Sequence, residues 1–137
     1  MGPTSTNRQV WVRSGVLVGA ADLLGELDVD ADALAADCGL DPAALTLPDL
    51  PAPGPAVVAY FESAAERSGC EDFGIRLASR QDLSILGPLW MTMRSAQTVR
   101  DALQVLALFF VAHTDGAVVG LEPQADGSAY VVYSLRA

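Results

Sequence analysis

The sequence has no lysine, one histidine and only two cysteines, Cys38 and Cys70. A disulfide-stabilised extracellular domain of this length usually carries more cysteine, so we expect both thiols to be reduced. No apolar run approaches the roughly 20 residues that cross a bilayer, and residues 1–10 lack the apolar core of a signal peptide. These absences favour a cytoplasmic location.

Positive charge is also scarce, because eight arginines stand against 17 acidic residues and the net charge is −9. Between Arg13 and Arg67 there is no basic residue at all. Such a surface repels the phosphates of nucleic acids and the headgroups of anionic membranes. The composition therefore predicts that this chain by itself binds neither DNA nor a membrane.

Hydrophobic residues, in contrast, make up 51% of the 137 residues. This is enough to build a core without disulfides or a metal ion, and the length is typical of one domain. We expect residues 1–11 to be a flexible amino-terminal segment and residues 12–137 to form a single domain.

Apolar residues recur at helical spacing through most of the chain up to residue 113, which predicts about six helices. The expected segments run from near Val12 to Leu27, over 31–38, over a short stretch opened by Asp41-Pro42, over 56–68, over 71–80, onward from Gly87-Pro88, and from Thr98 to His113.

Helix signals mark several of these boundaries. Asp30 is placed to cap the second helix, and Gly39 to end it. Thr98 with Asp101 three residues later resembles a capping box at the start of the last helix. Residues 46–55 carry four prolines and are predicted to be a loop.

The last twenty residues have a different pattern. Residues 117–123 and 128–135 are rich in valine and tyrosine, and Asp126-Gly127 between them is a turn signal. The fold class is therefore predicted to be α+β and helix-rich, with about six helices followed by a C-terminal β-hairpin. The hairpin needs helices to pack against and leaves two strand edges.

Residues that carry chemistry are few, so we predict that the protein is not an enzyme. His113 falls near the end of an apolar helix, where interaction of the imidazole with the helix dipole is the expected role and a catalytic or ligand-contacting role is the alternative. Cys38, Cys70 and His113 have no metal-ligand spacing, so neither a metal nor a cofactor is expected.

Candidate ligand contacts come from the aromatic residues. By spacing most of them belong to the core, but a subset can line an apolar pocket between helices. We select side chains that combine an apolar body with, in three of the four, a polar tip. The candidates are Tyr60, Trp90, Phe110 and His113.

A series of short motifs resembles the N-terminal effector domain of AraC-type transcriptional regulators, in the branch called the arabinose-binding domain. The matching residues are Phe73, Gly74, Arg76 and Leu77; then Leu86, Gly87 and Leu89; then Ser95, Thr98, Ala102, Leu103 and His113. Leu23, Leu24 and Leu27, together with residues 32–43, resemble the paired opening helices of that family.

The resemblance implies a sensor that binds a small metabolite, forms a dimer, or does both. It further implies that the chain is a truncated regulator, which would contact DNA only through a missing C-terminal domain with two helix-turn-helix units. The alternative is a stand-alone interaction module that pairs with a full-length regulator through the hairpin edge or through an apolar helix face.

Overall fold

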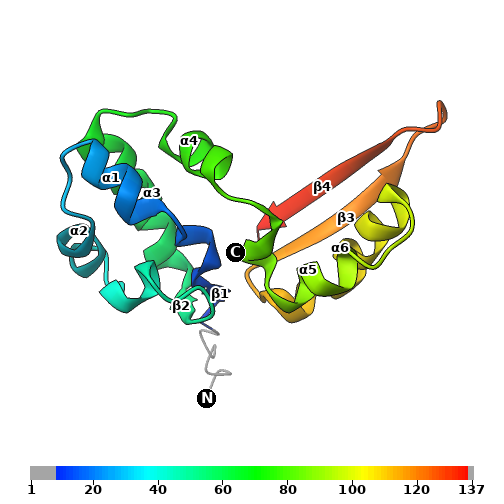
Figure 1. Ribbon diagram of the computed structural model, residues 1–137, viewed down its shortest axis with the longest axis horizontal. Helices are drawn as coiled ribbons and strands as arrows, with labels where there is room; N and C mark the ends of the chain where they lie inside the picture. The colour runs from blue at the N-terminus through cyan, green and yellow to red at the C-terminus, as the bar shows by residue number, and fades with distance from the viewer. Residues whose placement is uncertain (1–8, 136–137) are drawn as a thin grey trace, which may run out of the picture.

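The computed structural model describes residues 9–135 and has the predicted α+β fold (Figure 1). Six α-helices precede the hairpin: α1 (Ala20–Glu26), α2 (Ala31–Asp37), α3 (Gly54–Ser68), α4 (Phe73–Arg80), α5 (Pro88–Met93) and α6 (Val99–His113). The strands are β1 (Trp11–Arg13), β2 (Pro51–Pro53), β3 (Ala117–Pro123) and β4 (Ala129–Leu135). Short 3-10 turns cover Ser14–Leu17, Pro42–Leu45 and Leu83–Leu86.

The predicted capping residues make the expected hydrogen bonds. The carboxylate of Asp30 accepts from the Ala33 N–H at 3.0 Å, and the Thr98 hydroxyl accepts from the Asp101 N–H at 3.1 Å. Gly39 follows α2 with φ of +79°, a left-handed conformation that suits glycine. Local sequence therefore determines where α2 and α6 begin and where α2 ends.

The prediction of one helix from Val12 to Leu27 was wrong. Residues 11–13 form a strand, and α1 begins only at Ala20. Two glycines interrupt the segment. A Cβ on Gly15 would lie 2.7 Å from the Ile85 carbonyl oxygen, and Gly19 has φ of +86°. The chain therefore turns sharply between β1 and α1 although its apolar residues keep a helical spacing.

The proline-rich loop predicted for 46–55 also contains a strand. β2 pairs antiparallel with β1, with Trp11 opposite Pro53 and Arg13 opposite Pro51. Proline cannot donate a backbone hydrogen bond, so flanking residues complete the ladder. The Gly54 N–H donates to the Val10 carbonyl, and the Ser14 N–H to the Leu50 carbonyl, both at 2.8 Å.

Of the predicted flexible segment 1–11, residues 1–8 lie outside the described part of the chain and Trp11 belongs to β1. The rest of the chain builds two hydrophobic cores. The first lies among α1, α2, α3 and α4 and is centred on its fully buried members: Leu17, Leu24, Leu34, Tyr60 and Phe73. The second lies among α5, α6 and β3 and contains Leu89, Met93, Phe110, Ala117 and Val119.

Strand β1 joins these two cores near the middle of the molecule (Figure 1). Its Trp11 N–H donates to the Asp115 carboxylate at 2.9 Å, and its Trp11 carbonyl accepts from the Thr114 hydroxyl at 3.1 Å. The side-chain amide of Gln81 adds hydrogen bonds to the carbonyls of Val16 and Val18. Strand β1 is therefore held against the residues that directly follow α6.

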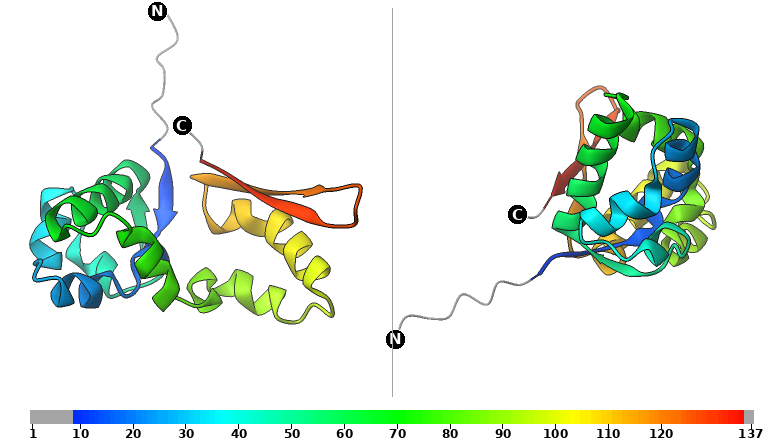
Figure 2. Two further views of the ribbon diagram at one scale, coloured as in Figure 1. Left: turned by 90° about the horizontal axis from the view of Figure 1, so that it is seen from above. Right: turned by 90° about the vertical axis from the view of Figure 1, so that its left-hand side faces the viewer.

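The hairpin is confirmed, with Val119 opposite Tyr133 and Leu121 opposite Val131. Figure 2 shows α5 and α6 on one side of it. Helix α6 packs mainly against β3 rather than against β4. Val131 is consequently 51% exposed and Tyr133 60% exposed, although both lie on the helix-facing side. No strand within residues 9–135 pairs with the outer edge of β4.

Candidate functional site

An apolar cleft of about 630 Å³ lies between α3, β1 and β4. Strand alternation points Val10 and Val12 to the same side of the strand, where both pack against Gly116. Helix α3 supplies the opposite wall. The cleft is lined by Val10, Val12, Val16, Gly54, Pro55, Val57, Val58, Phe61, Glu62, Gly116 and Tyr133.

Two of the residues that line this cleft carry polar groups, Glu62 a carboxylate and Tyr133 a hydroxyl. Partial burial raises the pKa of the Tyr133 phenol, so the group stays a neutral hydrogen-bond donor and acceptor near pH 7. No lining residue is basic. The cleft therefore suits an apolar molecule with few polar groups.

Tyr133 also connects the cleft with the second core. Its ring packs edge-on against Phe110, with ring centroids 6.2 Å apart and planes at 76°. Phe110 in turn lies 5.5 Å from the His113 ring. The rings of Tyr133, Phe110 and His113 therefore form a series of contacts from the cleft to the end of α6.

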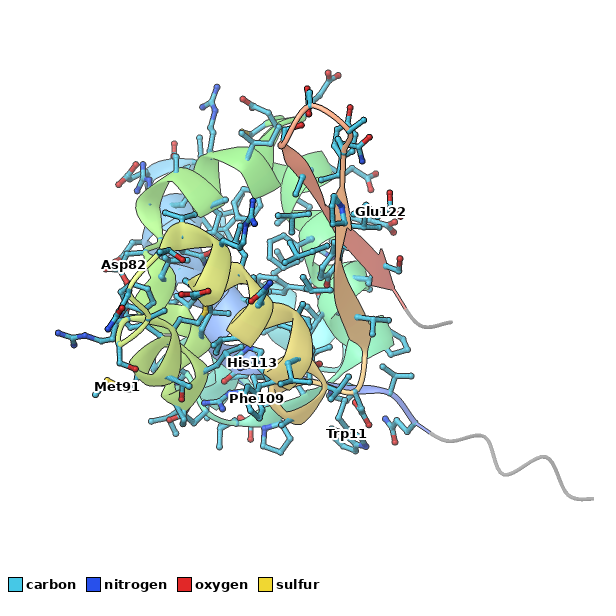
Figure 3. The ribbon with its side chains drawn as sticks, turned by 90° about the vertical axis from the view of Figure 1, so that its right-hand side faces the viewer. Trp11, Asp82, Met91, Phe109, His113 and Glu122 are labelled. Atoms are coloured by element: carbon cyan, nitrogen blue, oxygen red, sulfur yellow. The ribbon has the colours of Figure 1, made fainter. Side chains whose placement is uncertain are left out.

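A second and more polar site lies on the other side of β1, where Arg13 meets His113 at the end of α6. Two adjoining cavities of about 440 Å³ and 240 Å³ share Arg13, Ala112 and His113 as lining residues. Figure 3 shows His113 at the end of α6, with Trp11 on the nearby strand. We call this place the Arg13–His113 junction.

The charges at the junction are arranged unusually. Arg13 forms an ion pair with Asp49, and its side chain is only 23% exposed. Burial, and next the positive charge of Arg13, lower the pKa of His113, whereas hydrogen bonding with the Leu86 backbone opposes this shift. The fold thus favours neutral imidazole, whereas the sequence led us to expect a favourable contact of imidazolium with the helix dipole.

The four predicted ligand contacts are not gathered at one site. Phe110 and His113 are neighbours, and His113 lines the junction. Trp90 is partly buried in the second core. Tyr60 is fully buried in the first core, where its hydroxyl lies 3.4 Å from the Ala31 carbonyl and burial raises its pKa to about 12. Their ligand-binding role stays a prediction.

Arg13, Tyr133 and the valines of the cleft were missed by sequence reasoning. The apolar alternation of Val10 and Val12 was the available signal for a strand. This strand signal was not recognised because the residues that follow Val12 also fit a helical period. Tyr133 was assigned only to a strand, and nothing in the sequence showed that β4 would reach α3.

The described residues 9–135 contain no cluster of three or more potential metal ligands. Both cysteines are free, with Cys38 half-buried and Cys70 buried. None of the helices α1 to α6 is long and apolar enough to cross a membrane. The absence of a cofactor, and of enzymatic activity, stays a prediction.

Comparison with known proteins identifies the class of this fold. Residues 29–137 match the family described as the arabinose-binding domain of AraC transcription regulators, N-terminal. Since this is most of the chain, the protein belongs to that family of regulatory domains of transcription factors. The resemblance seen in the sequence is thereby confirmed.

A particular relative is the HTH-type transcriptional regulator VirS of Mycobacterium tuberculosis strain H37Rv. It is 37% identical over 57 residues, which are 42% of this chain and 17% of VirS. The VirS protein of strain CDC 1551 / Oshkosh gives the same values. The match therefore covers less than a fifth of the relative's length.

Proposed function

We propose that this chain is the effector-sensing part of an AraC-type regulator and that it binds a small apolar molecule in the cleft between α3, β1 and β4. The observation that carries this proposal is the composition and place of the cleft. Its walls come from α3 in the first half of the chain and from Tyr133 in the hairpin. A bound molecule would therefore contact both parts and favour one arrangement of them.

The chemistry of the walls argues against a sugar as the effector, despite the name of the family. A pentose has several hydroxyls, and each buried hydroxyl needs a hydrogen-bond partner. The cleft offers the side chains of Glu62 and Tyr133 for this purpose, while its other side chains are apolar. An apolar effector with one hydroxyl or amine fits better.

The signal would pass from the cleft through the rings of Tyr133, Phe110 and His113. The Tyr133 ring packs against Phe110, and the Phe110 ring packs against His113. We propose that it reaches a DNA-binding segment outside this chain, because the net charge of −9 makes the described domain itself a poor ligand for DNA. Such a regulator would work in the cytoplasm, where its operator is. Phe110 and His113 would then lie next to the bound effector and transmit the response to its binding.

A thermal-shift screen of small apolar compounds, followed by titration calorimetry of the hits, tests this function. Val58 lines the cleft and is 50% exposed, so Val58→Trp should fill the cleft without disturbing a core. We expect the affinity of a hit to fall at least about tenfold. Val99→Trp, at a 77% exposed position on α6, is the matched control. Hits that bind Val58→Trp as tightly as the wild type would contradict the proposed site.

A second candidate function is strand pairing with another chain. The outer edge of β4 lacks a partner within the described residues, and residues 129–135 contain neither a charge nor a proline that would protect the edge. This favours a homodimer, or pairing of a stand-alone module with a full-length regulator, through β4.

Light scattering after gel filtration tests this pairing. We expect a mass of twice 14.3 kDa at high protein concentration, and a monomer for Val131→Lys, which places a charge on the exposed strand. Leu108→Lys, 68% exposed on α6, should leave the dimer intact. A monomer at every concentration, with no binding of a full-length regulator, would rule this function out.

A further inference from the structure

Two buried nitrogens at the Arg13–His113 junction have no hydrogen-bond partner. They are Nε of Arg13 and Nδ1 of His113, and no other buried side-chain nitrogen or oxygen in residues 9–135 shares this state. Buried polar groups are almost always paired, and an unpaired one costs stability. Both exceptions belong to side chains that line the same two cavities, and this coincidence points to a ligand.

The chemistry of these two atoms defines what would pair with them. Arg13 Nε is an obligate donor, and His113 Nδ1 becomes a donor in one neutral tautomer and in the imidazolium. A single group that accepts from both is a carboxylate, whose two oxygens provide about four acceptor positions. We propose that the Arg13–His113 junction binds the carboxylate of a small apolar monocarboxylic acid, separately from the apolar cleft.

The walls of the two cavities suit such an acid. Trp11, Pro51 and Val111 line the larger cavity, and Leu89 and Phe109 line the smaller one. The larger cavity measures about 440 Å³, which accommodates a short aliphatic or aromatic tail. The charged head would lie at the boundary that the two cavities share.

One side chain of the protein competes for the same arginine. Asp49 already pairs with the Nη2 atom of Arg13, but its own side chain is 72% exposed. Because the Asp49 carboxylate is mostly exposed, water can solvate it when it leaves Arg13, so an incoming carboxylate could take its place. Asp49 would then act as a built-in competitor that sets the affinity of the site.

Binding of the carboxylate would also cause the protein to take up a proton. Three charged groups face the junction: Arg13 on β1, Asp49 before β2 and Asp115 after α6, of which Asp115 is held by the Trp11 N–H. The residues that line it from α5 are Pro88, Leu89 and Thr92, which carry no charge. In the free protein, burial and Arg13 favour neutral His113, whereas a bound anion would favour the imidazolium.

Titration calorimetry of the whole chain with hexanoate tests the proposal, with hexan-1-ol and hexylamine as uncharged and cationic analogues. We expect one hexanoate per chain, at least about tenfold tighter than hexan-1-ol, and no binding of hexylamine. Titrations near pH 6.5 in two buffers of different ionisation enthalpy should show proton uptake, which His113→Gln abolishes. Equal binding of acid and alcohol would overturn the proposal.

The deciding variant is Asp49→Asn, because it removes the competitor at an exposed position and leaves the fold in place. We expect hexanoate to bind several-fold tighter to this variant. The matched control is Asp37→Asn, which removes the carboxylate of the exposed Arg67 ion pair and should leave hexanoate binding unchanged. An unchanged affinity for Asp49→Asn would overturn the proposal, even if Arg13→Gln weakens binding by unfolding the protein.

The same titration separates this site from the apolar cleft. Hexanoate should bind Val58→Trp as tightly as the wild type, because Val58 does not line the junction. If Val58→Trp abolishes hexanoate binding while Asp49→Asn has no effect, the acid enters the apolar cleft. In that case the carboxylate site is wrong and the proposed sensing function survives.

Discussion

Gly87, at the entry of α5, lies directly against the guanidinium of Arg13 on β1. A Cβ at position 87 would stand 2.9 Å from Nη2 of the arginine. The backbone of Gly87 also has φ of +57° and ψ of −128°, a conformation that only glycine adopts without strain. Glycine at this position therefore permits both the backbone turn that begins α5 and the close approach of Arg13.

Replacement of Gly87 should be costly. Gly87→Ala is expected to lower the free energy of unfolding by about 2 kcal/mol, mainly through backbone strain, because the arginine side chain can move away. Urea denaturation measures the change. The control is Gly74→Ala in α4, where nothing lies within 4 Å of a new Cβ, and we expect a gain of about 0.5 kcal/mol. Equal effects of the two substitutions would contradict this account.

Phe110 and its neighbour Phe109 provide a matched pair on α6. Phe110 is 9% exposed and contacts Tyr133, whereas Phe109 is 48% exposed. Phe110→Ala should lower the free energy of unfolding by about 3 kcal/mol, because it leaves a cavity in the second core. Phe109→Ala should cost less than about 1 kcal/mol. Thermal unfolding followed by circular dichroism compares the two variants.

Stability should fall as the solution is acidified from pH 7.5 to 5.5. The folded state lowers the pKa of His113 from the ordinary value of 6.5, so the unfolded chain takes up a proton more readily in this window. Stability is complete above the unfolded pKa and decreases below it. His113 is the only histidine, so His113→Gln should flatten the curve, as measured by urea denaturation at each pH. A wild-type curve with no slope would contradict the shift.

The two thiols should react at different rates. Burial, and next the hydrogen bond from its Sγ to the Asp72 carboxylate at 3.2 Å, raise the pKa of Cys70 and suppress its thiolate. Cys38 is half-buried and more accessible. Alkylation with iodoacetamide, followed by mass spectrometry, should modify Cys38 first. In Cys38→Ser the fast phase should disappear; fast labelling of Cys70 in the native protein would be inconsistent with its burial.

Local signals predicted the helices and the hairpin because their boundaries depend on near neighbours. Asp30 and Thr98 cap helices within three residues of themselves, and the Asp126-Gly127 turn needs only its own strands. The strand at residues 11–13 could not be found this way. Its partners are residue 53 and Asp115, and the helical spacing of the next apolar residues suggested a helix instead.

The candidate site was predictable in part for the same reason. Phe110 and His113 were selected because each has an apolar body, to which His113 adds a polar tip. Arg13, which faces His113 across the junction, is 100 positions away in the sequence and had no local signal. Tyr60 was selected for its polar tip, but its surroundings in the first core depend on how α2 and α3 pack, which no local pattern specifies.

The distance in sequence between strand β1 and its partners has a consequence for folding during synthesis on the ribosome. Trp11 leaves the exit tunnel early, but its hydrogen-bond partners at Thr114 and Asp115 lie 103 and 104 positions later. Helices α1 to α4 can assemble their own core during this interval, because nearly all contacts of that core lie between residues 12 and 77. Strand β1 therefore obtains these partners only after residues 114 and 115 have been made, when the first core can already have formed.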